Sequence, residues 1–123
     1  MAEFLVSPPE RTQWSLPVED FGRVVLERWP RAGLRRWGGG SHLRASAWVK
    51  APSAWDDLLL ELHGNGSTLG IDARDQLLAA EAACWWRRVV PAEIPVLWLY
   101  DRGFSGYSEI WPHTAPAEVF SPR

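Results

Sequence analysis

The sequence predicts an α+β fold, with a single mainly antiparallel sheet of about six or seven strands and two amphipathic helices on one face. Three observations lead to this prediction. Two long segments carry apolar residues at helical spacing. Several short segments alternate or are rich in β-forming residues. Tight turns join most of these short segments, which makes antiparallel neighbours the expected arrangement.

The first helix is predicted over residues 18–29. Apolar residues recur every three or four positions from Val18 to Trp29, with charged residues between them. Ser15 is the expected N-cap, and Pro17 falls in the first turn, where a missing N–H costs little. Pro30 should end the helix.

The second helix should begin after Asp72 as N-cap, with Asp75 three residues on in a pattern close to a capping box. Its apolar face runs from Leu78 to Val89, and Pro91 ends it. Cys84 falls off the main apolar stripe and is expected to be half-buried. A last short helical turn is predicted from Thr114, as its cap, through residue 120.

Strand patterns account for most of the remaining chain. Asn65-Gly66 between two of the strands is typical of a two-residue type I′ turn, which needs positive φ at both central residues. The pairing of the first strand stays open. The predicted strands are 3–7, 34–37, 43–51, 57–63, 68–72, 96–100 and 107–111.

The strand at 96–100 lacks polar alternation, because Val96, Trp98 and Tyr100 share one face and leucines occupy the other. A strand that is apolar on both faces is expected at the centre of a sheet, covered on both sides. Two helices cover only one side. The other needs a cover of its own: a loop or tail carrying Trp14 or Phe120, a second copy of this chain, or a partner.

Composition and charge set further bounds. The chain has 123 residues, of which 46% are hydrophobic and 23% charged, which fits one globular domain over 1–123. Its net charge of −2 and its lack of a dense basic patch make nucleic acid an unexpected partner. We expect no membrane span and no signal peptide. Cys84 is the single cysteine, so a reducing cytoplasm is the expected location.

No catalytic motif or metal-ligand spacing is present, so no cofactor is expected and the chain is interpreted as non-enzymatic. The best acid/base candidates are Glu61 with His63, two residues apart on one strand face, and Asp101 with Glu109, which could converge across the last hairpin near His113.

The most unusual feature is the presence of 9 tryptophans. Each buries about 150–250 Å² and needs a partner for its N–H when buried, so several are expected at the surface. Tryptophan and tyrosine are also common binding hot spots. The candidate interaction surface comprises Trp37, Trp48, Trp98, Tyr100 and Trp111.

The second half of the chain resembles small uncharacterised bacterial α+β proteins, some of them similar to immunity proteins of polymorphic toxin systems. The segments that carry the resemblance are Leu69-Gly70-Ile71-Asp72, 82–91, 96–101 and 114–119. It implies a bacterial protein without catalytic residues that binds and blocks a partner protein. Two alternatives stay open: a small-ligand or carbohydrate binder that uses exposed Trp37, Trp48 or Trp55, and a small enzyme that uses the acid/base pairs above.

Overall fold

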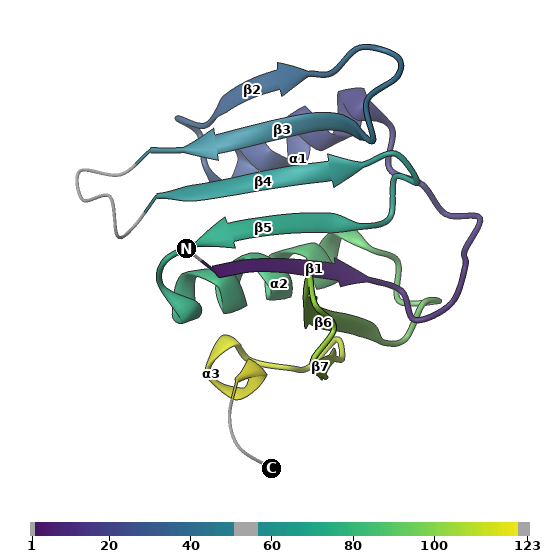
Figure 1. Ribbon diagram of the computed structural model, residues 1–123, viewed down its shortest axis with the longest axis vertical. Coiled ribbons are helices and arrows are strands. Elements are labelled where there is room, and N and C mark those ends of the chain that lie inside the picture. Colours follow the sequence, from purple (N-terminus) through teal and green to yellow (C-terminus); the bar gives the residue numbers. More distant parts are fainter. Residues whose placement is uncertain (1, 51–56, 121–123) are drawn as a thin grey trace.

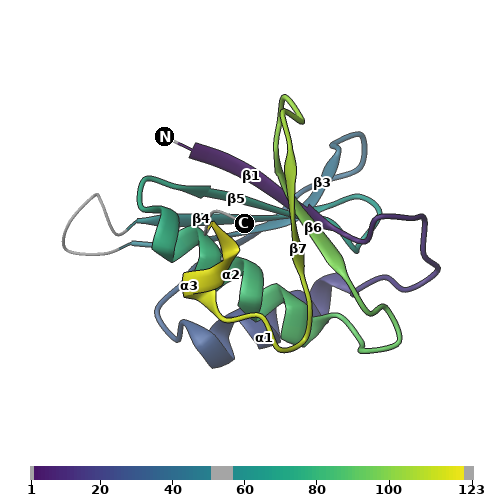
Figure 2. The same ribbon diagram turned by 90° about the horizontal axis from the view of Figure 1, so that it is seen from below.

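A computed structural model describes residues 2–50 and 57–120, and it confirms the α+β prediction. One sheet of seven strands runs in the order β2-β3-β4-β5-β1-β6-β7, with every neighbouring pair antiparallel (Figure 1). The two long helices lie against one face (Figure 2). The elements are β1 (Ala2–Ser7), α1 (Val18–Arg28), β2 (Gly33–Arg36), β3 (Leu43–Val49), β4 (Leu58–His63), β5 (Leu69–Ala73), α2 (Gln76–Val89), β6 (Leu97–Asp101), β7 (Tyr107–Ile110) and α3 (Pro116–Val119). Residue 51 of the predicted third strand and Trp55 lie outside the described residues.

The first strand, whose pairing the sequence left open, lies inside the sheet between β5 and β6 and runs antiparallel to both. It joins the two antiparallel parts of the sheet, β2 to β5 and the hairpin β6–β7. Pro8 and Pro9 follow the strand, where a missing backbone N–H removes no ladder bond.

The register gives the sheet two different faces, because opposed residues in an antiparallel ladder point to the same side. In β4 the burial alternates as predicted, with Leu58, Leu60 and Leu62 buried and the residues between them partly exposed. The residues buried on the face toward the helices include Val6, Leu60, Leu62, Leu69, Ile71, Leu97, Leu99 and Ile110.

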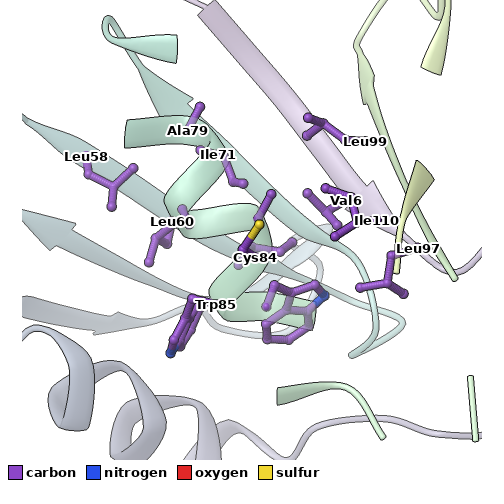
Figure 3. Packing of buried hydrophobic residues seen from close by; sticks show 14 of the residues in the cluster. Val6, Leu58, Leu60, Ile71, Ala79, Cys84, Trp85, Leu97, Leu99 and Ile110 are labelled. Atoms are coloured by element: carbon purple, nitrogen blue, oxygen red, sulfur yellow. The ribbon is translucent and has the colours of Figure 1, made fainter. Parts of the chain in front are cut away.

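Helix α2 packs on the middle of this face and is buried around much of its circumference (Figure 3). Trp85 packs edge-on against Trp29 at the end of α1, with ring centroids 5.0 Å apart. On another side, the Cys84 thiol lies 3.5 Å from the Thr114 carbonyl before α3. The expectation that Cys84 is half-buried is therefore wrong: it is 4% exposed, because α3 covers the side of the helix that the apolar stripe leaves out.

The helix ends differ from their prediction in their capping residues. Pro17 takes the N-cap position of α1 without a side-chain hydrogen bond, while the Ser15 hydroxyl accepts a bond from Arg44. Strand β5 extends through Asp72, so the N-cap of α2 is Asp75, whose carboxylate accepts from the Leu77 N–H. Thr114 does not cap α3, since its hydroxyl accepts from the Trp111 N–H instead.

The turn between β4 and β5 is also not the predicted type I′ turn. It spans five residues, 64–68, and only Gly66 has positive φ (+72°), so Asn65 lacks the dihedral that a type I′ turn requires. The Asn65 side chain instead accepts from the Ser67 and Thr68 N–H groups and donates to the Thr68 hydroxyl. A Cβ at Gly66 would collide with Ser15, which fixes glycine there.

The position of strand β6 differs from the prediction that this strand lies at the centre of the sheet. It lies next to the edge strand β7 instead of at the centre of the sheet. Leu97 and Leu99 are buried toward the helices, while Trp98 and Tyr100 lie on the opposite face. Aromatic residues of the hairpin itself cover part of that second face, which is why a strand with two apolar faces is stable so near the edge.

Trp86 is the side chain whose loss we expect to cost most stability. It is fully buried, donates its indole N–H to the Ser67 carbonyl at 3.2 Å and packs against Trp14. Trp86→Phe leaves that buried carbonyl without its donor and opens a small cavity. We expect the free energy of unfolding, measured by urea denaturation, to fall by about 2–4 kcal/mol. Trp48→Phe, at a 55% exposed position, is the matched control and should change it by less than about 0.5 kcal/mol.

Candidate functional site

The candidate site is the open face, meaning the surface of the sheet opposite α1 and α2. Neither of the two aromatic residues expected as possible covers lies on it. Trp14 packs against Trp86 of α2, and Phe120 packs against Phe4, which faces the helices beside the core residue Val6. Neither Trp14 nor Phe120 therefore covers this face.

The β6–β7 hairpin forms one wall of the open face. Its tip projects on the side away from α1 and α2 (Figure 2). Trp98 and Tyr107 stack with ring centroids 4.2 Å apart, and Phe104 lies edge-on to Tyr100 at 5.1 Å. We call these four residues, Trp98, Tyr100, Phe104 and Tyr107, the hairpin aromatic cluster.

The turn that carries Phe104 is held in a strained conformation. Phe104 has a φ of +49°, which is uncommon for a residue with a bulky side chain. Asp101 stabilises this turn, because its carboxylate accepts bonds from both the backbone N–H and the hydroxyl of Ser105. The same bonds lower the pKa of Asp101. This backbone conformation leaves the Phe104 ring half-exposed beside the other rings of the cluster. A strained conformation of this kind persists only where surrounding contacts fix it.

Next to this wall, three carboxylates lie on neighbouring strands of the open face. Glu3 of β1 is opposite Asp72 of β5. Glu61 of β4 is opposite Gly70, which is the next residue of β5 on the same face as Asp72. Arg102, just after β6, pairs with Glu3 and lies 4.0 Å from Glu61. We call these three residues, Glu3, Glu61 and Asp72, the acidic floor. Their carboxylates carry three negative charges, of which Arg102 balances one. Burial and the neighbouring charge of Glu3 raise the pKa of Asp72, although Arg102 opposes the shift.

His63 and Glu61 share the open face as predicted, but they do not form a hydrogen-bonded pair. The imidazole lies against Gly70, where a Cβ would come within 3.1 Å of Nε2. Nε2 is buried with no hydrogen-bond partner among the described residues. Burial, then His42, then Arg102 lower the pKa of His63, so the ring is neutral near pH 7. Because Glu61 pairs with Arg102 instead, the ring lacks the carboxylate that orients a catalytic base.

The second acid/base pair is not brought together. Tyr100 is opposite Tyr107 and Trp98 is opposite Glu109, so Asp101 lies beyond the end of the ladder while Glu109 is two residues inside it. The Asp101 carboxylate is engaged by Ser105. This arrangement explains Asp101 as a structural residue of the turn.

The five residues of the predicted interaction surface separate into three places. Trp98 and Tyr100 belong to the hairpin aromatic cluster. Trp37 and Trp48 lie near the opposite edge of the same face, where Trp37 donates to Ser46 and its ring lies 4.0 Å from the Arg35 guanidinium carbon. Trp111 follows the end of β7 and is 37% exposed.

Sequence reasoning missed five residues of this face: Glu3, Asp72, Arg102, Phe104 and Tyr107. Tyr107 carried a usable signal, because pairing 96–100 with 107–111 as a hairpin places it beside Tyr100. Phe104 and Arg102 carried none, since a turn residue and a charged residue after a strand are ordinary. Their roles depend on the fold of the hairpin over the sheet.

A pocket of about 500 Å³ opens where the hairpin aromatic cluster meets the ends of β1 and β4. Its lining comes from three segments, residues 7–12, the 64–68 turn and the hairpin. In the described part of the chain, no group of three or more histidine, cysteine, aspartate or glutamate side chains could hold a metal ion. No helix described here has the length and apolar character needed to cross a membrane.

No family model matches this sequence, and no curated protein or solved structure is significantly similar to it. The resemblance to immunity-like proteins therefore stays a prediction, and the function has to be argued from the open face itself.

The environment of His63 predicts a pH dependence of stability. In the unfolded chain His63 takes up a proton near its ordinary pKa of about 6.5, whereas the folded protein binds that proton only at lower pH. The unfolded state thus binds more protons in the window below pH 6.5, and this contribution to stability is lost on acidification. In urea titrations between about pH 7.5 and 5, His63→Gln should lose stability less steeply than the wild type.

Asp72→Asn is the control of opposite sign. The raised pKa of Asp72 makes the folded state bind its proton first as pH falls toward the ordinary value of 3.8, which favours folding. Without it, stability should fall more steeply on acidification, in titrations extended down to about pH 4. Parallel pH profiles for the wild type and both variants would contradict the described environments.

Proposed function

We propose that this chain is a non-enzymatic protein-interaction domain that binds a partner protein through the open face, in the way expected of an immunity-like protein. The observation that carries the proposal is an uncovered sheet face that combines half-exposed aromatic rings with an acidic floor. Phe104 and Tyr107 are each 51% exposed, and Trp48 is 55% exposed, although their neighbours on the other face are buried.

The charge of this face defines the partner's chemistry. The acidic floor has two more negative charges than Arg102 balances, and Arg102 shows that a guanidinium fits between carboxylates from β1 and β4. Aromatic rings beside acids favour arginine and lysine side chains, which stack on rings and pair with carboxylates. We therefore expect a partner that presents a basic surface, bound in the cytoplasm.

The role as an interaction domain is favoured over an enzyme by the acid/base groups themselves. Glu61 pairs with Arg102, the Asp101 carboxylate accepts from Ser105, and burial lowers the pKa of His63, whose Nε2 has no hydrogen-bond partner among the described residues. Each of these groups has a structural partner or a buried environment. None of them is hydrogen-bonded to a second acid/base group that would orient it as a general base.

The test uses the full chain as bait in extracts of its source, followed by affinity measurements on the recovered partner. Tyr107→Ala removes an exposed ring of the cluster and should weaken binding by about 2 kcal/mol, which is about a thirtyfold rise in Kd. Glu3→Gln removes an exposed floor charge and should slow association and reduce its dependence on salt.

Leu77→Ala is the matched control, because Leu77 is also 51% exposed but lies on α2, on the other layer. It should leave the affinity unchanged. A partner whose affinity drops with Leu77→Ala but not with Tyr107→Ala would contradict the proposal. Sedimentation equilibrium of the chain alone tests the related case in which the partner is a second copy.

A further inference from the structure

The pocket beside the hairpin has one aromatic wall. Trp98, Tyr100 and Phe104 line it from the side of β6 and its turn. The Tyr100 hydroxyl is hydrogen-bonded to the Ser7 hydroxyl at 3.0 Å, which ties this wall to the end of β1. The Asp101–Ser105 bonds fix the turn that holds Phe104. The rings are therefore set in position before any ligand arrives, which lowers the entropy cost of binding.

The other walls of the pocket are rich in hydroxyl groups. Ser7 is the last residue of β1, Thr12 comes from the segment after it, and Ser67 and Thr68 come from the 64–68 turn. Three bonds of the Asn65 side chain hold that turn, and the Trp86 indole N–H anchors it to α2 through the Ser67 carbonyl. A hydroxyl offers one donor and two acceptor sites, so one existing bond leaves each of them capacity for a ligand.

The charge of the lining does not favour a strongly ionic ligand. The charged side chains that line the pocket are Glu10 and Arg11, one of each sign. A surplus of cations favours a phosphate or another anion, and several carboxylates favour a metal ion, and this lining offers neither. The volume of about 500 Å³ falls within the range of ordinary small-molecule sites.

From these features we infer that the pocket binds an uncharged sugar ring. A sugar offers an apolar face of C–H groups to an aromatic ring and hydroxyls around its edge to the surrounding hydroxyls. This site differs from the platforms that the sequence indicated, since Trp37 and Trp48 lie at the other side of the sheet. Their rings are also approached by Arg35 and Lys50, at 4.0 and 5.5 Å.

The inference concerns the pocket and not the acidic floor, although the two proposals share the rings of Trp98, Tyr100 and Phe104. It is tested on the isolated full chain. Saturation-transfer NMR against neutral mono- and disaccharides should show transfer to at least one sugar, with a Kd between about 10 µM and 1 mM by calorimetry. Phe104→Ala should raise that Kd about tenfold or more, and Ser7→Ala, which removes a hydroxyl from another wall, should also raise it severalfold.

Trp48→Ala is the matched control, an exposed tryptophan at the opposite edge of the same face, and it should leave the Kd unchanged. The inference is overturned if no sugar shows transfer at concentrations up to about 10 mM. It is equally overturned if nucleosides bind more tightly than sugars, or if Trp48→Ala weakens binding and folded Ser7→Ala and Phe104→Ala do not. None of these results bears on binding of a basic partner to the acidic floor.

Discussion

The alternation of side chains along seven antiparallel strands is the constraint on which the rest of this structure depends. Because opposed residues in each ladder point to the same side, the register from Ala45 of β3 to β7 assigns these strand residues to the helix side or the open side, and it shifts only between Leu43 and Ala45. Two long helices supply a single layer, so they can bury only one side. The aromatic and acidic residues of the other side are left for solvent, for one another or for a ligand.

The tryptophans show how the chain divides its aromatic residues between these two sides. Trp14, Trp29, Trp85 and Trp86 form a connected set of ring contacts in the helix layer. Their packing makes α2 the centre of the core, and the indole N–H of Trp86 finds a carbonyl there. Trp37, Trp48 and Trp98 lie on the open face, with Arg35, Lys50 or neighbouring rings beside them. Packing in the core thus accounts for the presence of four tryptophans. It does not account for those on the open face, which the proposed binding roles would explain.

The hairpin β6–β7 links the fold to both proposals. The strained turn at Phe104 holds a ring over the open face, and Asp101 is engaged in keeping it there. Arg102, one residue further, reaches back across the sheet to Glu3 and Glu61. One short turn therefore positions the aromatic wall, partly neutralises the acidic floor and closes one side of the pocket. Local strain of this kind is stable only where surrounding contacts fix it, and it often accompanies a binding site.

The sequence by itself determined the fold class, nearly all the strands and helices, and the two faces of β4, because periodicity depends only on neighbouring residues and on which of them avoid water. It also placed Glu61 and His63 on one face, since residues two apart in a strand share a side. The tertiary structure alone decided that β1 lies between β5 and β6, that Asp75 caps α2 and that Glu61 pairs with Arg102 and not with His63. The place of β1 and the partner of Glu61 depend on contacts between residues far apart in the chain. The cap at Asp75 follows from the same contacts, because pairing with β1 extends β5 through Ala73. No local pattern encodes such contacts, because each side chain had several compatible partners until the sheet order selected one.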